Sequence, residues 1–158
     1  MSMTEIQKTE TQIMELSQKL AQLRRDVPAV KIKNYNFQTL NGEVSLLDLF
    51  AGRDTLFMIH NMGQGCRYCT LWADGFNAFT DHLEDKFALV VVSKDQPEIQ
   101  RRISNSRGWR FRMASHGGGE YIKEQSVREG EGNFPGVVVY QRKGNDIYSI
   151  KLPFNKDY

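Results

Sequence analysis

Residues 55–72, TLFMIHNMGQGCRYCTLW, form the stretch that decides the fold. The run Thr55–His60 is apolar throughout, which is typical of a strand in the middle of a sheet covered on both faces. From Thr70 to Leu83 the apolar residues recur at helical spacing. Between the two lie the only cysteines of the chain, Cys66 and Cys69, in a C-x-x-C arrangement at the expected helix start. Thiols at this spacing can close and release a small-ring disulfide, so the first hypothesis is a dithiol–disulfide switch.

Length and composition describe an ordinary globular protein. The chain has 158 residues, which fits one compact core that buries about two-thirds of the unfolded surface. Hydrophobic residues make up 40% and charged residues 25%, and the net charge is +2. This charge is too small to favour nucleic acid or an anionic membrane surface, and no run approaches the roughly 18 apolar residues of a membrane span. We therefore expect neither a nucleic-acid partner nor a membrane partner.

The first residues indicate the compartment. They are polar and mixed in charge, unlike a secretory signal, so we expect a cytoplasmic protein. Thiols are kept reduced there, and a lone C-x-x-C then indicates redox chemistry or metal binding more readily than a structural bridge.

Residues 1–27 are expected to form a separate amphipathic helix that Pro28 ends. Its apolar residues follow one another at intervals of seven, three, four, three and four: Ile6, Ile13, Leu16, Leu20, Leu23 and Val27. Such a stripe must bury against something. It packs either on its own domain or on the same helix of a second chain as a homodimer contact, and the sequence leaves both interpretations open. The helix also allows a function purely as a binding or dimerisation module.

Residues 28–158 are expected to form an α/β domain. Strands alternate with helices and a hairpin follows, which predicts a mixed β-sheet flanked by helices. The expected elements are a hairpin turning at Asn41-Gly42, strands at 55–60 and 87–93, a helix from Pro97 ended by Gly108, a strand at 109–113, a long irregular segment at 114–133 with a short helix near 121–125, and a C-terminal hairpin at 137–152.

The position of the two cysteines predicts different roles for them. A cysteine at a helix N-terminus meets unpaired backbone N–H groups and the positive end of the helix dipole, and Arg67 adds a positive charge. In such motifs the thiol pKa falls from about 8.5 into the range of roughly 3.5 to 7.5. Cys66 is therefore the expected nucleophile, and Cys69, one turn into the helix, is the expected resolving thiol.

The chain resembles the thioredoxin-like superfamily, and within it a bacterial family of predicted dithiol-disulfide oxidoreductases formerly described as a domain of unknown function. The resemblance runs from Leu20 to about Ile150, and its most specific part is the Cys-x-x-Cys-x-x-Trp-Ala-Asp string that begins at Cys66. It implies a thioredoxin-like fold with the N-terminal helix as an extension, and Cys66 and Cys69 as the redox pair. The residues after Leu152 are too few for the terminal helix of that fold.

The resemblance also implies two further site residues. Thioredoxin-like proteins place a cis-proline before a late strand, facing the dithiol, and Pro135 fits that position. Thioredoxin keeps a buried acid six residues before its first cysteine. That position is His60 here, whose imidazole would serve as the general base for the resolving thiol.

The leading interpretation is a thiol–disulfide oxidoreductase whose partners are a protein or small-molecule disulfide substrate and a thiol electron donor. No cofactor is expected. A peroxidase on the same fold is one alternative, although Gly63 replaces the threonine that peroxiredoxins place three residues before the reactive cysteine. A non-enzymatic metal carrier or redox sensor is another, in which Cys66, Cys69 and a histidine such as His116 would serve as ligands, although no second C-x-x-C is present.

Overall fold

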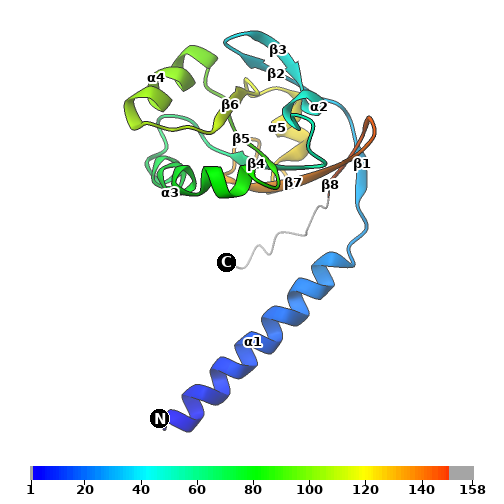
Figure 1. Ribbon diagram of the computed structural model, residues 1–158, viewed down its shortest axis with the longest axis vertical. Helices are drawn as coiled ribbons and strands as arrows, with labels where there is room; N and C mark the ends of the chain where they lie inside the picture. The colour runs from blue at the N-terminus through cyan, green and yellow to red at the C-terminus, as the bar shows by residue number, and fades with distance from the viewer. Residues whose placement is uncertain (1, 150–158) are drawn as a thin grey trace.

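The computed structural model describes residues 2–149. These residues form one mixed sheet of eight strands in the order β1-β8-β7-β4-β5-β6-β2-β3 (Figure 1). The elements are α1 (Met3–Arg25), β1 (Val30–Ile32), β2 (Asn36–Thr39), β3 (Gly42–Ser45), α2 (Leu46–Leu49), β4 (Thr55–His60), α3 (Arg67–Glu84), β5 (Ala88–Ser93), α4 (Pro97–Arg107), β6 (Arg112–Ser115), α5 (Glu120–Gln125), β7 (Gly136–Lys143) and β8 (Asp146–Ser149).

The apolar strands lie in the centre of the sheet, as expected. β4 and β5 are parallel neighbours, β6 pairs in parallel with β5, and β7 is antiparallel to β4. Side chains alternate between the faces of these strands. Met58 and Val90 join a cluster that contains residues of α2 and α5, whereas Ile59 and Val91 join a cluster with residues of α3. The expected mixed sheet with helices on both faces is confirmed.

Local signals set several boundaries. α4 begins at Pro97, which occupies the first helical turn, and ends at Gly108, whose φ of 66° is the left-handed conformation that glycine adopts most readily. The Asn41-Gly42 turn joins β2 to β3 as predicted. The strand expected at 109–113 is shifted, because Trp109 and Phe111 pack in the core before β6 begins. Beyond β8, the predicted strand residues up to Leu152 lie outside the described residues.

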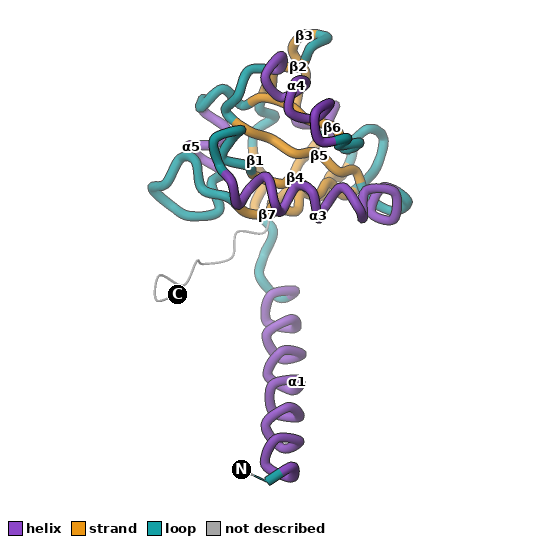
Figure 2. The backbone as a smooth tube through the Cα atoms, turned by 90° about the vertical axis from the view of Figure 1, so that its left-hand side faces the viewer, coloured by secondary structure: helices purple, strands orange, loops and turns teal. Residues whose placement is uncertain are grey.

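The N-terminal helix corrects one expectation. α1 has no buried residue, and it stands away from the sheet and the other helices (Figures 1 and 2). The interpretation that its apolar stripe packs on its own domain is therefore wrong for this structure. The reason is the connection: residues 26–29 lead directly into β1 at the edge of the sheet, and the helix continues outward from that edge. No helix in the described part of the chain has the length and hydropathy needed to cross a membrane.

Candidate functional site

The site forms where β4 ends and α3 begins. The Asn61 N–H still donates to the Val92 carbonyl, 2.9 Å away, so β4 stays tied to β5 up to the loop. The loop then turns at Gly63, whose φ is 105°. A Cβ on Gly63 would lie 2.8 Å from a carboxylate oxygen of Asp95, and the other carboxylate oxygen accepts the Gln64 N–H at 2.6 Å. Both the left-handed backbone and the close approach of Asp95 require glycine here.

The two cysteines form a disulfide, with Cα atoms 5.3 Å apart. Cys66 is the N-cap of α3 and is partly exposed, whereas Cys69 is only 6% exposed. Each sulfur accepts one backbone hydrogen bond: the Cys69 N–H donates to Cys66 Sγ at 3.1 Å, and the Met62 N–H donates to Cys69 Sγ at 3.4 Å. Such donors stabilise a thiolate when the bridge opens. Cys66, the expected nucleophile, is thus the more exposed of the two residues, and the roles of Cys66 and Cys69 stay predictions.

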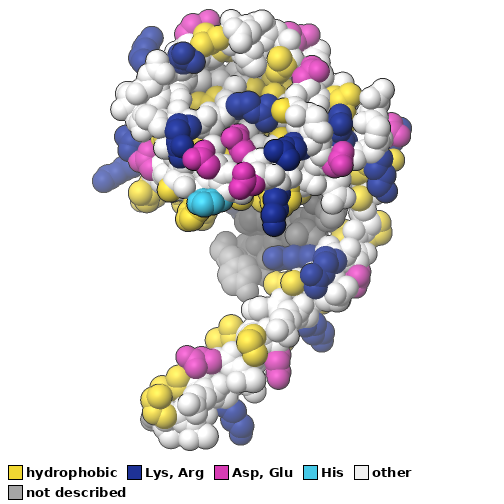
Figure 3. All heavy atoms as spheres, in the orientation of Figure 1, with side chains coloured by type: hydrophobic (Ala, Val, Ile, Leu, Met, Phe, Trp, Pro, Cys, Tyr) yellow, Lys and Arg dark blue, Asp and Glu magenta, His cyan; other side chains and the backbone are white. Residues whose placement is uncertain are grey.

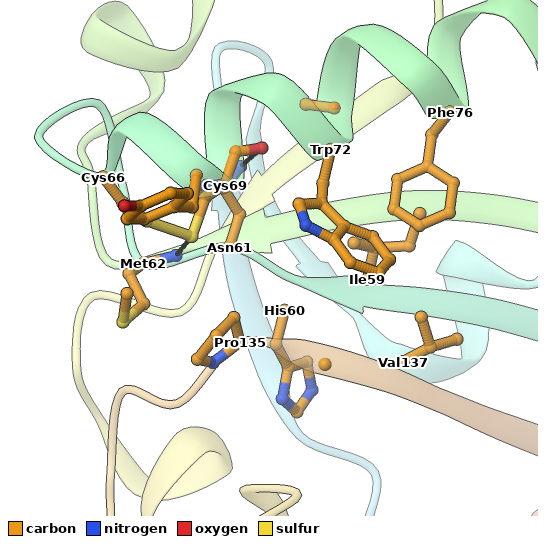
Figure 4. Close-up of a pocket in the computed structure, with 13 residues that line it drawn as sticks. Ile59, His60, Asn61, Met62, Cys66, Cys69, Trp72, Phe76, Pro135 and Val137 are labelled. Carbon is orange, nitrogen blue, oxygen red and sulfur yellow. Dashed lines mark hydrogen bonds between the residues drawn. A yellow bond between two sulfur atoms is a disulfide. The ribbon is translucent and has the colours of Figure 1, made fainter.

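The disulfide opens into an apolar pocket of about 310 Å³, which is at the small end of the range for ligand sites. One side of the pocket is formed by α3 and its N-cap, with both cysteines, Tyr68, Trp72, Ala73 and Phe76 (Figure 4). The opposite side has two parts. The end of β4 and the loop after it contribute residues 59–62, and the start of β7 contributes residues 135–137. The pocket therefore lies between the helix that carries the pair and the strand that follows the proline.

Large apolar side chains surround the pocket without being buried. Tyr68 is 76% exposed, Trp72 is 66% exposed and Val137 is 45% exposed. In Figure 3 hydrophobic side chains gather at the lower edge of the domain, where Figure 1 places α3. The sequence analysis did not assign Tyr68, Trp72 and Phe76 to the site, although their four-residue spacing places them on one helix face. A contiguous exposed apolar surface of this kind indicates a binding site.

His60 lies at the end of β4, buried to 3% exposure. Its Nε2 is 2.7 Å from Tyr121 Oη, and that hydroxyl is 3.0 Å from Tyr140 Oη. Burial, with a smaller contribution from His116, lowers the pKa of His60 to about 3, so the imidazole is neutral at pH 7. Figure 4 shows its ring turned away from the two sulfurs. The role of His60 as general base stays a prediction, and its hydrogen bond joins it to the core tyrosines.

Pro135 lines the pocket, and the structure settles the conformation of its peptide bond, which the sequence leaves open between cis and trans. No described residue has a cis peptide bond, so Phe134–Pro135 is trans. Trans is favoured by about 0.5–1 kcal/mol for such bonds, and a proline before a strand does not by itself reverse that preference. Gly136 pairs with His60 in the register of β7 and β4, which carries Pro135 to the loop that holds the cysteines. The Asn133 side chain donates to the Met62 carbonyl at 3.4 Å and joins the two loops.

In the Trp-Ala-Asp string after the cysteines, Asp74 has a structural role. Asp74 accepts hydrogen bonds from Arg107 Nε at 2.8 Å and from Trp109 Nε1 at 2.7 Å. Both donors lower the pKa of Asp74, to about 2. The carboxylate thus fixes α3 to the end of α4 and the chain that follows it, while Trp72 of the same string faces the pocket.

Among residues 2–149, no third metal ligand lies with the two cysteines. His116 follows β6 and its Nδ1 accepts the Gly118 N–H at 3.0 Å, and burial lowers its pKa to about 4. Within residues 2–149, no group of three or more His, Cys, Asp or Glu side chains is arranged to hold a metal ion.

The sequence matches the model of one protein family over residues 2–152, and this family is described as "Bacterial protein of unknown function (DUF899)". The match spans most of the chain, so the protein belongs to this family. No curated protein matches the sequence.

Three solved structures give the fold. Peroxidoxin BcpB from Mycobacterium tuberculosis is similar with a TM-score of 0.59 and 14% identity, over 78% of this chain and 86% of that chain. A putative protein disulfide isomerase from Bacteroides thetaiotaomicron has a TM-score of 0.55 and 14% identity, over 78% and 79%. A thiol:disulfide interchange protein from Bacteroides sp. has a TM-score of 0.57 and 17% identity, over 72% and 74%. The predicted thioredoxin-like fold is confirmed.

Proposed function

This protein belongs to the matched bacterial family and has a thioredoxin-like fold. We propose that it is a thiol–disulfide oxidoreductase that works through Cys66 and Cys69. One observation carries the proposal: the disulfide at the N-terminus of α3 opens directly into an apolar pocket, with Cys66 partly exposed and Cys69 buried. A disulfide that serves only to stabilise the core is inert and does not need to be accessible to a substrate. The proposed partners are a disulfide substrate and a thiol electron donor.

The steps follow from the positions of the two sulfurs. In the reduced protein the Cys66 thiolate attacks one sulfur of the substrate disulfide, and the other substrate sulfur leaves as a thiolate that takes up a proton. The Cys69 thiolate then attacks Cys66 Sγ, breaks the mixed disulfide and releases the second substrate thiol. Two electrons pass to the substrate, and the protein is left with the Cys66–Cys69 bridge that the structure contains. The thiol donor reduces the bridge by the same steps in reverse.

The pocket defines the class of substrate. Trp72, Phe76 and Val137 offer apolar contacts beside the disulfide, and none of the described residues that line the cavity is Lys, Arg, Asp or Glu. We therefore propose a substrate disulfide flanked by apolar groups, such as a hydrophobic segment of an unfolded protein. Pro135 would shape the groove from the β7 side.

The test is insulin-disulfide reduction with dithiothreitol as donor. Wild-type protein is expected to accelerate it, Cys66→Ser to abolish the acceleration, and Cys69→Ser to accumulate a mixed disulfide visible by mass spectrometry of the intact protein. The Cys66→Ser/Cys69→Ser variant is the control for background. Wild-type rates equal to those of this control would refute the proposal.

The alternative functions give different results in the same protein. A peroxidase predicts oxidation of reduced Cys66 by hydrogen peroxide far faster than that of a free thiol. A metal carrier predicts stoichiometric zinc or copper(I) in the reduced protein, measured by elemental analysis. A redox sensor predicts reversible bridge formation without turnover of insulin.

A further inference from the structure

The apolar stripe of α1 is an exposed surface of the described chain that the proposed function does not use. Five of its side chains are between 39% and 65% exposed, although each is an isoleucine or a leucine: Ile6, Ile13, Leu16, Leu20 and Leu23. Figure 1 shows the whole helix free of the sheet, and Figure 3 shows hydrophobic side chains along it. The helix has 23 residues and is therefore about 35 Å long.

The width of the stripe indicates the kind of surface that covers it. Ile6, Ile13 and Leu20 are seven residues apart, and Leu16 and Leu23 stand three residues after two of them. This is the narrow a/d seam of a coiled coil, whereas a helix that covers a sheet has a wider apolar face. A seam of this kind fits another helix with the same spacing.

We propose that α1 pairs with α1 of a second copy of this chain, and that the two helices run antiparallel. The charges select this orientation. Residues 2–15 contain three glutamates and one lysine, whereas residues 16–25 contain one lysine, two arginines and no acid. Antiparallel pairing places the acidic half of each helix beside the basic half of its partner. Parallel pairing places acid beside acid and base beside base, which is destabilising.

The flanking positions of the seam give the same answer. In a parallel pair the residues that face each other beside the seam are Glu5 with the partner's Glu10, and Lys19 with the partner's Arg24, both like-charged. In the antiparallel pair the residues that face each other beside the seam are Glu10 with the partner's Ser17 and Gln12 with the partner's Lys19, and neither pair is like-charged. The one like-charged approach that remains, Glu5 with Asp26, involves the C-cap residue that ends the helix.

The antiparallel register keeps the seam apolar. Ile6 faces the partner's Leu23 and Ile13 faces the partner's Leu16, and each contact occurs twice by symmetry. Thr9 faces the partner's Leu20. The connection of residues 26–29 then places one sheet domain at each end of the paired helices, so the domains do not crowd each other.

The first test is the mass of the full-length protein in solution. Light scattering is expected to give twice the 18.2 kDa of one chain. Leu16→Lys, which places a charge in the central layer, is expected to give the single-chain mass. Met14→Lys, on the outside of the same turn, is the matched control and should remain dimeric. A single-chain mass for the wild type at 100 µM would overturn the proposal. This holds whether the apolar stripe binds a different protein or has no partner.

The second test fixes the orientation. Ile6→Cys and Leu23→Cys are made separately in the Cys66→Ser/Cys69→Ser background, so that each chain carries one thiol. With diamide as oxidant, the antiparallel pair predicts a covalent dimer only when the two variants are mixed. Covalent dimers of each variant alone, with none added by mixing, would show parallel helices and overturn the orientation.

Neither test depends on redox activity. Loss of insulin reduction would leave the mass and the crosslinks unchanged. Likewise, the predicted dimer mass and the predicted antiparallel orientation can prove wrong while Cys66 and Cys69 remain an active redox pair.

Discussion

The buried histidine beside the site gives a prediction whose size follows from the structure. The perturbation is a fall in pH from 7 to 5, and the measured quantity is the free energy of unfolding. His60 has a pKa of about 3 in the folded protein, against 6.5 for the free side chain. Between these values the unfolded chain binds a proton that the folded protein does not. The stability contributed by His60 is therefore complete above pH 6.5 and is lost as the pH falls toward 3.

The magnitude at pH 5 comes from the unfolded imidazole. It lies 1.5 pH units below its pKa of 6.5, so its protonation lowers the free energy of unfolding by about 2 kcal/mol. His116, with a pKa of about 4, contributes a similar amount. The wild type is expected to lose about 4 kcal/mol between pH 7 and pH 5, and His60→Gln only about half of that.

Urea unfolding followed by tryptophan fluorescence at pH 7, 6 and 5 measures this difference. His82→Gln is the matched control for the loss of an imidazole, because His82 is exposed on α3. A pH dependence in His60→Gln equal to that of the wild type would contradict the low pKa of His60. That outcome would favour an imidazole that titrates near neutral pH, which is the property that a general base for Cys69 requires.

Three further predictions concern the loop, the pocket and the reactive sulfur. Gly63→Ala is expected to destabilise the protein by about 1–3 kcal/mol, because of its φ of 105° and the carboxylate 2.8 Å from the new Cβ; Gly65→Ala, with nothing within 4 Å, is the control, and equal stabilities would contradict this reasoning. Trp72→Ala is expected to raise KM for insulin about tenfold, as loss of one apolar contact predicts, whereas Leu71→Ala, equally exposed at 66% but outside the pocket, should leave KM unchanged. Equal KM values would remove the pocket from substrate binding. Reduced protein should react with peroxide at the rate of a free thiol, measured by stopped-flow fluorescence, and a much faster reaction would favour a peroxidase.

The part of the fold that the sequence predicts well is set by short-range signals. An apolar run, a C-x-x-C and a helical period identify β4 and α3, because each signal lies within the element itself. Asn41-Gly42 and Gly108 mark a turn and a helix end for the same reason. The partly exposed Cys66 and the buried Cys69 follow directly from their positions in the first turn of that helix.

The rest depends on contacts between distant parts of the chain. β1 pairs with β8, more than 100 residues further along the chain, and nothing within Val30–Ile32 specifies that partner. The spacing of a thioredoxin acid predicts the position of His60, but its neighbour Tyr121 comes from 61 residues further along the chain. The pocket likewise needs both α3 and the start of β7. Tyr68 and Trp72 were therefore indistinguishable from core residues in the sequence.

Two apolar surfaces remain uncovered in the described chain, and their shapes assign them to different partners. The seam of α1 is one residue wide at each level and, from Ile6 to Leu23, about 26 Å long by the geometry of a helix, so it matches a second helix. The surface around Trp72 and Val137 is hollowed and contains the Cys66–Cys69 disulfide, so it fits the proposed substrate, which binds and is then released. A helix docked permanently in that pocket would block access to Cys66. Dimerisation through α1 and catalysis at the pocket are therefore compatible, and Leu16→Lys is expected to separate them by abolishing the first while leaving the rate of insulin reduction per chain unchanged.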